Sequence, residues 1–425
     1  MKPGTMRWVD HWVGVPLCAA LTVHRWVVGR RRRPPEAVDR IVLVKLAEQG
    51  STVLAYPAIR RAIELVGREN LFFLVFEENR FILDLLNLVP RANILTIPTH
   101  SPAALTRGLI VAINRMRREE IDAAVDLEFF ARSSAALCYL GGASRRVGFH
   151  ARDGGGPWRG DLMTHRLSYN PHLHTSLAFA MQVESLNVPP HQLPAMGVAM
   201  PGAERTAPEA QFSQHQVDEV RAILRSAAGR NDISDLVLLN PNCSDLLPLR
   251  MWPRERYVQL ARLLLARYER LHLAFTGAPG EKEAVSRLVG EVGNERCFSM
   301  AGRTTLEQLV ALYSLARVLV TNDSGPAHFA ALTPVEVVTL FGPETPRLFA
   351  SRSGRNHVLW AGLPCSPCVS AYNNRNSTCS DNLCMQSITV QQVFDEACRI
   401  LDSDAPACST REGDAALHED AEGKP

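Results

Sequence analysis

Short apolar runs rich in β-branched residues alternate with helical stretches along most of this chain, and the alternation occurs twice. Helical patterns such as 52–66 and 104–118 lie between the runs. Near-continuous apolar strands separated by helices are typical of parallel sheets that are buried on both faces. The sequence therefore predicts an α/β protein. The candidate strands are 40–46, 71–76, 93–98 and 121–127 in the first part, and 235–241, 271–277, 317–323 and 335–343 in the second.

The alternation lapses between these two parts. Residues 148–161 are rich in glycine, and residues 187–211 are rich in Pro, Gly and Ala, as linkers are. A chain of 425 residues that is 46% apolar is long enough to form two cores. We expect two doubly wound, Rossmann-like domains that face a central cleft. The predicted segments are an amino-terminal segment (1–37), a first domain (38–190), a linker (191–212), a second domain (213–397) and a disordered acidic tail (398–425).

Charge and cysteine content exclude some classes of protein. The formal net charge of +2 argues against a nucleic-acid-binding protein, which normally carries a dominant basic face. Ten cysteines in a chain of this length do not indicate a secreted disulfide scaffold. Four of them cluster with the spacing Cys-x2-Cys-x10-Cys-x4-Cys, and four such thiolates can hold a structural zinc ion. Disulfide-clipped loops and reduced thiols are the alternatives for Cys365, Cys368, Cys379 and Cys384.

The amino-terminal segment 11–29 is apolar but is interrupted by Pro16, His24 and Arg25. A membrane-spanning helix needs about 20 apolar residues in succession, so this segment is a poor candidate for one. A secretory signal needs a small-residue cleavage site, and the run of arginines that follows at 30–33 is a poor continuation of one. One interpretation is an amphipathic helix that lies on the cytoplasmic side of a membrane, with the arginines held by anionic lipid. The other is a helix packed on the surface of the protein itself.

The junction after the candidate strand 317–323 has the residues of an anion site. Asp323 or Ser324 can cap the helix that follows, and a proline is favoured in its first turn. Gly325 allows a ligand to approach the backbone closely. The free amides of a helix start attract anions. His328 lies one helical turn after Ser324, where its imidazole can reach a phosphate oxygen.

Other strand ends in the second part carry polar or basic residues as well. Ser244 and Arg250 follow one candidate strand, and "LFGPETP" (340–346) follows another. After a further strand, Glu281 or Glu283 can accept hydrogen bonds from a ribose. Ligands of open parallel sheets bind beyond the carboxyl ends of the strands. These strand ends together predict a pocket for a nucleotide diphosphate.

These segments resemble a known family. "TNDSGPAHFAAL" and "TLFGPETP" are similar to the donor-site motif of glycosyltransferase family 9, the heptosyltransferases. "LNPNCSDLLPLRMWPRERY" resembles the family segment "NPGAS…KRWP", which puts Arg250 at the position of a phosphate-binding lysine. "MAGRTTLEQLVALYSLARVLVTND", "RIVLVKLAEQGSTVLAYPAIRRA", "VDLEFFARSSAALCYLGGASRRVGF" and the cysteine cluster are also similar to family segments, so the resemblance covers about 38–397.

The resemblance implies a GT-B fold and an inverting transfer of a sugar, typically heptose from ADP-heptose. The implied acceptor is a lipopolysaccharide core or another lipid-linked saccharide. It also implies a bacterial protein that is cytoplasmic and peripheral on the inner face of the membrane. No metal is required, because a helix start, Arg250 and His328 can neutralise a leaving diphosphate. The sequence leaves the sugar, the nucleotide, the acceptor and the oligomeric state open.

The chain departs from the family at the position of the catalytic base. Family members have Gly-Asp where this chain has Gly50-Ser51, and inversion needs a base that takes the proton of the acceptor hydroxyl. Glu48 and Glu128 are the candidate replacements, although each can equally be a capping or surface carboxylate. Two alternatives to a transferase stay open: an epimerase of nucleotide sugars on the same fold, and a relative that binds the donor without turnover.

Basic residues of the first domain are candidates for the acceptor site. A lipid-linked saccharide of this kind is anionic, so arginines near the cleft can hold it, although long basic side chains are more often surface residues. Histidines near the start of a helix can also contact it. The candidates are Arg60, Arg61, Arg145, Arg146, His172 and His174.

Overall fold

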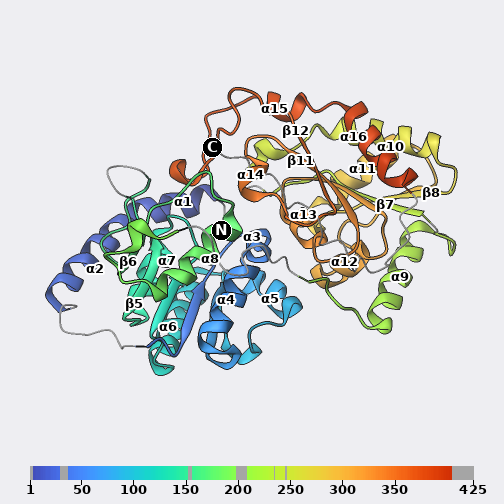
Figure 1. Ribbon diagram of the computed structural model, residues 1–425. Helices are drawn as coiled ribbons and strands as arrows, with labels where there is room; N and C mark the ends of the chain where they lie inside the picture. Colours follow the sequence, from blue (N-terminus) through green and yellow to red (C-terminus); the bar gives the residue numbers. More distant parts are fainter. Residues whose placement is uncertain are drawn as a thin grey trace, which may run out of the picture.

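The computed structural model describes residues 3–28, 37–151, 156–197, 208–233, 235–244 and 247–403. It contains two six-stranded parallel sheets that lie beside each other, one in each half of the chain (Figure 1). We call residues up to 197 the N-terminal half and residues from 208 the C-terminal half. The predicted pair of Rossmann-like sheets is confirmed.

The sheet of the N-terminal half has the strand order β3-β2-β1-β4-β5-β6, which is the order of a Rossmann sheet. All four strands predicted for this half are present. The structure also contains β5 and β6, which the sequence did not predict. β5 carries Arg145, Arg146 and Gly148 instead of an apolar run, and β6 has only three residues. The strands are β1 (Ile41–Val44), β2 (Leu71–Phe76), β3 (Ile94–Ile97), β4 (Ala123–Asp126), β5 (Arg145–Phe149) and β6 (His165–Leu167).

The sheet of the C-terminal half repeats this arrangement with the order β12-β11-β10-β7-β8-β9. The four predicted strands are again present, and the two edge strands β9 and β12 are additional. The strands are β7 (Asp235–Asn240), β8 (Leu271–Phe275), β9 (Cys297–Ser299), β10 (Val318–Asn322), β11 (Glu336–Phe341) and β12 (Asn356–Trp360).

Helices cover both faces of each sheet, as buried parallel strands require. In the N-terminal half, α4 and α8 pack on one face and α6 and α7 on the other. In the C-terminal half, α10, α11 and α16 pack on one face and α9, α12 and α13 on the other. The helices are α1 (Pro3–Trp12), α2 (Gly14–Val28), α3 (Gln49–Leu54), α4 (Tyr56–Val66), α5 (Phe81–Leu86), α6 (Pro102–Arg118), α7 (Arg132–Leu140), α8 (Thr175–Glu184), α9 (Gln214–Ala228), α10 (Arg254–Arg267), α11 (Lys282–Val292), α12 (Leu306–Tyr313), α13 (Gly325–Ala330), α14 (Pro346–Phe349), α15 (Leu383–Gln386) and α16 (Val390–Asp402).

The two halves are joined by apolar contacts. Phe81 of α5 packs edge-on against Phe329 of α13, with ring centroids 5.1 Å apart. Phe129 of the N-terminal half packs edge-on against Phe349 of α14, with centroids 6.4 Å apart. Each contact belongs to a hydrophobic cluster that includes residues of both halves. The carboxyl ends of the two sheets are therefore held at one junction.

The amino-terminal segment forms two helices, α1 and α2, and part of their surface packs on the protein. Arg132 of α7 forms an ion pair with Asp10 at 2.7 Å, and Cys18 and Thr22 are buried. The other side is exposed and apolar, with Trp8, Trp12 and Val27 each more than half accessible. Within the described ranges, no helix combines the length and hydropathy needed to cross a membrane. The arginine run 30–33 lies outside the described residues.

The carboxyl-terminal boundary differs from the expectation. We predicted a disordered tail from residue 398, but α16 continues to Asp402 and buries Cys398, Ile400 and Leu401. These side chains continue the apolar face of α16 and pack in the cluster that also holds α10. Residues 404–425 and residues 198–207 of the predicted linker lie outside the described residues.

Candidate functional site

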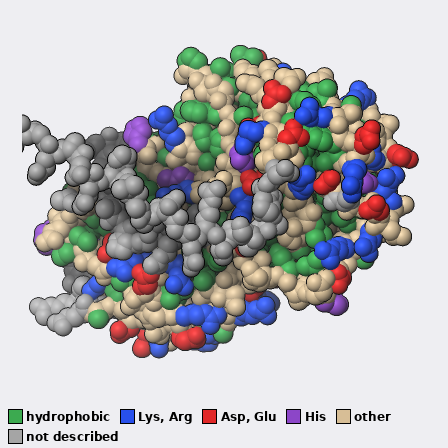
Figure 2. All heavy atoms as spheres, turned by 45° about the vertical axis from the view of Figure 1, so that its right-hand side comes forward, with side chains coloured by type: hydrophobic (Ala, Val, Ile, Leu, Met, Phe, Trp, Pro, Cys, Tyr) green, Lys and Arg blue, Asp and Glu red, His purple; other side chains and the backbone are tan. Residues whose placement is uncertain are grey.

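A cluster of buried and partly buried charged side chains lies where the carboxyl ends of the two sheets meet. Three are cations and three are carboxylates, and they alternate in space through the ion pairs described below. On the face of the molecule shown in Figure 2, surface charges of both signs are likewise intermixed. The cluster consists of Lys45, Arg250 and Arg375 with Glu48, Glu128 and Glu344.

Glu128 holds the loop that follows β1. One of its carboxylate oxygens accepts hydrogen bonds from the backbone amides of Leu46, at 2.8 Å, and Ala47, at 2.9 Å. Both of its oxygens lie 3.1 Å from Nζ of Lys45, which is completely buried and also donates to the Ala47 carbonyl at 2.6 Å. These side-chain contacts of Glu128 all stabilise the loop that follows β1. The geometry favours a structural role for Glu128.

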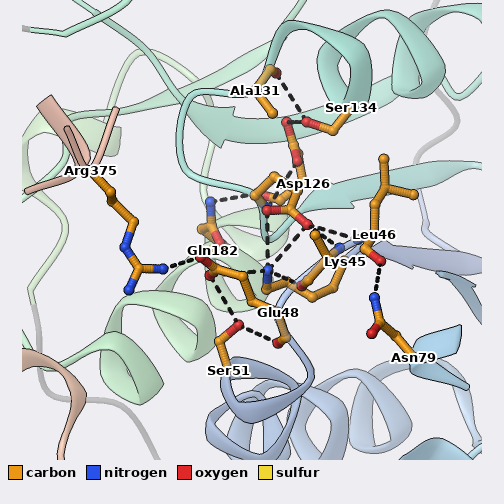
Figure 3. Close-up of polar contacts among 12 residues, drawn as sticks. Lys45, Leu46, Glu48, Ser51, Asn79, Asp126, Ala131, Ser134, Gln182 and Arg375 are labelled. Carbon is orange, nitrogen blue, oxygen red and sulfur yellow. Dashed lines mark hydrogen bonds and ion pairs between the residues drawn. The ribbon is translucent and has the colours of Figure 1, made fainter. Parts of the chain in front are cut away.

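Glu48 stands in the same loop but points toward the C-terminal half (Figure 3). Its backbone is left-handed (φ 65°), and it precedes α3 as the N-cap residue. Arg375 donates to its Oε1, and Nζ of Lys45 lies 3.8 Å from its Oε2. Burial raises the pKa of Glu48, but Arg375, Lys45 and Arg250 outweigh it and lower that pKa from 4.5 to about 2. Glu48 is therefore ionised in this arrangement.

Ser51 stands at the position of the family aspartate, and its side chain binds a backbone group. Its Oγ donates a hydrogen bond to the Glu48 carbonyl at 2.8 Å. Gly50 contacts the other half, because a Cβ added there would lie only 2.5 Å from Cδ2 of His328. Any larger residue at position 50 would displace His328. The short loop thus brings Glu48 next to the predicted donor site.

In the C-terminal half, Glu344 is completely buried and pairs with both arginines of the cluster. Arg375 donates to its two oxygens at 2.9 and 2.7 Å, and Nη1 of Arg250 lies 3.5 Å from Oε2. Asp323 at the end of β10 is buried nearby. Burial and then the adjacent Glu344 carboxylate raise the pKa of Asp323 to about 7. Asp323 therefore gains a proton near neutral pH, while Glu344 is stabilised by its two cations.

Three buried polar atoms of this site have no hydrogen-bond partner among the residues that the structure describes. They are Nε of Arg250, Nδ1 of His328 and Oδ2 of Asp323. Burial and then the positive charge of Arg250 lower the pKa of His328 to about 4. His328 is therefore a neutral imidazole at physiological pH. A buried polar group without a partner is costly, so the two nitrogens are available to an anionic ligand.

Asn322 fixes the loops that carry this site. Its Oδ1 accepts hydrogen bonds from the Trp252 amide and the Tyr257 hydroxyl, each at 3.1 Å. Its Nδ2 donates to the carbonyls of Pro241 and Asn242 at 3.3 and 3.2 Å. One side chain therefore connects the ends of β7 and β10 with the start of α10. This explains the buried asparagine before Asp323.

Other predicted donor-site residues are placed less centrally. Ser324 is the N-cap residue of the short helix α13, but its Oγ donates to the Asn322 carbonyl at 3.2 Å and makes no cap hydrogen bond. Gly325 opens α13 and has a negative φ, so no left-handed conformation demands a glycine. Ser244 is exposed. Glu281 accepts a hydrogen bond from the Ala278 amide at 2.6 Å, which closes a local turn.

The structure does not bring the predicted acceptor arginines together. Arg145 begins β5 and pairs in register with Ala123, at the amino end of the sheet, and it donates to the Leu186 carbonyl at 3.1 Å. That is the edge opposite to Glu128, because parallel strands share one direction. Arg60 lies half-buried in the first part of α4, which starts at the carboxyl edge of the sheet, the edge at which Glu128 lies. His174 caps α8 and contacts the Ala350 carbonyl at 2.9 Å, so its role is structural.

The zinc hypothesis is not supported. In the described part of the chain, no group of three or more His, Cys, Asp or Glu side chains is arranged to hold a metal ion. Cys365 and Cys379 are exposed, whereas Cys384 is buried against Gly342. All four clustered cysteines are free thiols.

A cavity of about 330 Å³ also lies at the junction, but it is separate from the charged cluster. Its lining includes Tyr56, Ser176, Arg352 and Arg355 and none of the six cluster residues. A ligand that reaches the cluster competes with the ion pairs among its side chains.

Sequence reasoning missed three members of the cluster. Lys45 and Glu344 stand inside segments singled out for other residues, and Arg375 lies in a loop between two cysteines. Glu344 stands three residues after β11 and is buried, and a buried carboxylate requires a cation partner. The sequence does not reveal this burial, so it did not point to Arg375.

Two Rossmann-like sheets whose carboxyl ends meet at a charged junction define a protein of the GT-B fold. A solved structure with this fold, "E. coli ADP-heptose lps heptosyltransferase II", superposes with a TM-score of 0.62 over 85% of this chain and 98% of that chain, at 18% identity. The family model of glycosyltransferase family 9 (heptosyltransferase) matches residues 111–378. The chain belongs to this family.

Curated relatives are heptosyltransferases as well. Lipopolysaccharide heptosyltransferase 2 of Salmonella typhimurium is 34% identical over 115 residues, which are 26% of this chain and 32% of the relative. The lipopolysaccharide core heptosyltransferase OpsX of Haemophilus influenzae is 23% identical over 328 residues, 76% of this chain and 85% of the relative. The chain thus matches about a third of the length of the heptosyltransferase 2 relative.

Proposed function

We propose that this protein is an inverting glycosyltransferase that takes a sugar from a nucleotide-diphosphate donor. The observation that carries the proposal is the pairing across the junction. A carboxylate of the N-terminal half, Glu48, faces a set of anion-binding groups of the C-terminal half, Arg250 and His328. A base on one side and a diphosphate site on the other are what displacement at an anomeric carbon needs.

The reaction is a single displacement. The carboxylate of Glu48 accepts the proton of the acceptor hydroxyl, and the hydroxyl oxygen forms a bond to the anomeric carbon of the sugar. The bond from that carbon to the diphosphate oxygen breaks, and the nucleoside diphosphate leaves with the electron pair. Arg250 and the neutral imidazole of His328 donate hydrogen bonds to the leaving group. Asp323 is partly protonated at neutral pH, and in its protonated form its Oδ2 can donate a hydrogen bond to the leaving group without repelling it.

Heptose is the proposed sugar, ADP-heptose the proposed donor and a lipopolysaccharide core or other lipid-linked saccharide the proposed acceptor. The names of the relatives support this choice, since they are called lipopolysaccharide heptosyltransferases. Membership of the family favours transfer over epimerisation. Arg60 remains the candidate for contact with an anionic acceptor.

We also propose that the protein works at the inner face of the cytoplasmic membrane, where a lipid-linked acceptor is presented. The exposed apolar side of α1 and α2, with Trp8, Trp12 and Val27, supports peripheral contact with lipid. Tryptophans suit the boundary between lipid and water.

Calorimetric titration with ADP-heptose tests the proposed function. We expect the wild-type protein to bind ADP-heptose more tightly than UDP-glucose or GDP-mannose, and Asp323→Ala and His328→Ala to lose most of this binding. Arg267→Gln, which removes an exposed ion pair with Asp402, is the matched control and should bind normally. If no nucleotide sugar binds to the wild-type protein, the proposed function is wrong.

A further inference from the structure

Arg375 connects the two halves through the charged cluster. Its guanidinium donates to Glu48, 327 residues earlier in the chain, and to both oxygens of Glu344. It also lies 5.3 Å from the ring centroid of Phe349. No role for this arginine follows from the resemblance to the family, and the proposed transfer has so far not used it.

The loop around Arg375 is built to present this side chain. Asn374 and Arg375 both have left-handed backbones (φ 53°), and the Arg375 amide donates to the Ser370 carbonyl at 2.9 Å. Asn373 accepts from the Ser370 amide at 3.0 Å and donates to the Cys368 carbonyl at 2.9 Å. A left-handed non-glycine residue costs energy and persists only where its surroundings fix it. The turn is therefore defined by its own hydrogen bonds and directs Arg375 into the junction.

The charges of the cluster balance without a ligand. Three cations face three carboxylates, His328 is neutral, and Asp323, whose pKa is raised to about 7, carries part of a further negative charge. A nucleotide diphosphate adds negative charge, so it must draw at least one cation away from its carboxylate. Lys45 is completely buried and Arg250 is 11% exposed, whereas Arg375 is 21% exposed. Arg375 is thus the cation that an incoming anion reaches most easily, and its guanidinium matches the geometry of phosphate.

Loss of the ion pair with Arg375 raises the pKa of Glu48. Arg375 is the charged neighbour that lowers the pKa of Glu48 most, and a carboxylate in a tight ion pair is a weak base. When the guanidinium turns to a phosphate, Glu48 keeps only the more distant Lys45 and Arg250 as cationic neighbours. Its basicity then rises toward the range in which a general base is effective.

We infer that Arg375 is a positioning residue that couples donor binding to the base: it pairs with Glu48 until a nucleotide diphosphate binds, then binds that diphosphate and releases Glu48 for proton abstraction. The inference rests on the proposed function and extends it. Glu344 keeps Arg250 as a partner throughout, so the buried carboxylate is never left without a cation.

The pH dependence of transfer from ADP-heptose tests the coupling. The acid limb of kcat/KM reports Glu48 in the free enzyme, and that of kcat reports Glu48 in the donor complex. In the wild-type enzyme we expect the limb of kcat to lie at higher pH than that of kcat/KM. In Arg375→Gln the two limbs should coincide, and KM for ADP-heptose should rise about 10- to 100-fold, as for a lost charge-assisted hydrogen bond.

Two further variants separate coupling from stability. Arg375→Lys keeps the charge, so we expect a smaller rise of KM and limbs that stay apart. Arg375→Gln combined with Glu344→Gln removes a buried charge together with its partner, and it should fold even if the single variant does not. Arg267→Gln is the control and should resemble wild type. Coincident limbs in wild type, or an unchanged KM in a folded Arg375→Gln, would overturn the inference while wild-type transfer still upheld the proposed function.

Discussion

Two glutamates at neighbouring strand ends, Glu48 after β1 and Glu128 after β4, are predicted to differ in function because their contacts differ. Glu48 reaches across the junction, whereas Glu128 is occupied by two backbone amides and Lys45. We expect Glu48→Gln to lower kcat about 10²- to 10⁴-fold, the usual contribution of a positioned base. Its KM for ADP-heptose should not rise, because Arg375 no longer has to leave Glu48 to bind the diphosphate. Its free energy of unfolding should fall less than that of Glu128→Gln, because Arg375 still pairs with Glu344.

Glu128→Gln is the matched comparison for this prediction. It leaves the buried Lys45 without its closest carboxylate, so we expect it to lower the free energy of unfolding by about 3–5 kcal/mol. Steady-state kinetics and urea denaturation of both variants distinguish the two roles. A Glu48→Gln enzyme with wild-type kcat would remove Glu48 as the base.

At the same scale, the sequence was informative where function depends on neighbouring residues. Asp323 and His328 share one strand–helix junction, and Arg250 follows another strand end, so the rule that ligands bind at the carboxyl ends of strands located all three. The Arg375 pair with Glu48 joins residues 327 positions apart. No local pattern encodes such a pair. In the sequence, the loop of Arg375 drew attention only through the cysteines around it. Arg145 was misplaced because a basic residue near a strand does not reveal which end of the strand it occupies.

Among the elements, strands with a near-continuous apolar run were predictable, including the edge strand β3, whereas the inner strand β5 and the edge strands β6, β9 and β12 were not. The central strands β1, β4, β7 and β10 are largely apolar and buried, because both of their faces are covered. The edge strand β6 has three residues and begins with a histidine, and every residue of β12 is only partly buried. Their hydrogen bonds to a neighbouring strand, rather than their composition, make them strands.

For the helices α1 and α2, the sequence left two interpretations open: a helix on a membrane surface and a helix packed on the protein itself. One side packs on α7, and the other exposes apolar residues. We expect the full-length protein to float with vesicles that contain phosphatidylglycerol. The double variant Trp8→Ser, Trp12→Ser should bind at least about 10-fold more weakly, because burial of each large apolar side chain contributes about 1.5–3 kcal/mol.

Leu383→Ser is the control for this experiment, because Leu383 is an exposed apolar residue of the C-terminal half. It should float like the wild-type protein. Equal flotation of the double variant and the control would show that this side of α1 and α2 does not contact lipid.

For the whole molecule, the repeated pattern of strands predicts two halves that face each other. How the two halves are placed against each other depends on side-chain packing. Four of the six strands of each sheet can be deduced from its own half of the sequence. The relative placement of the halves depends on contacts between distant residues, such as Phe81 with Phe329 and Phe129 with Phe349. Such pairs satisfy ordinary rules of burial in either half, so they are visible only once both halves are folded.

Because hydrophobic clusters include residues of both halves, we expect the wild-type protein to unfold in one cooperative transition. Phe81→Ala removes an aromatic contact between the halves, which costs about 0.5–1.5 kcal/mol beyond the apolar area that it buries. The coupling between the halves should weaken, and differential scanning calorimetry should show a calorimetric enthalpy that exceeds the van't Hoff enthalpy. Phe76 is a partly buried residue packed against the core of the N-terminal half, away from the contacts between the halves. Phe76→Ala should lower Tm, and it should broaden the transition less than Phe81→Ala does. A single sharp transition in Phe81→Ala would mean that the remaining contacts at the junction, including those of Arg375, are sufficient to couple the two halves.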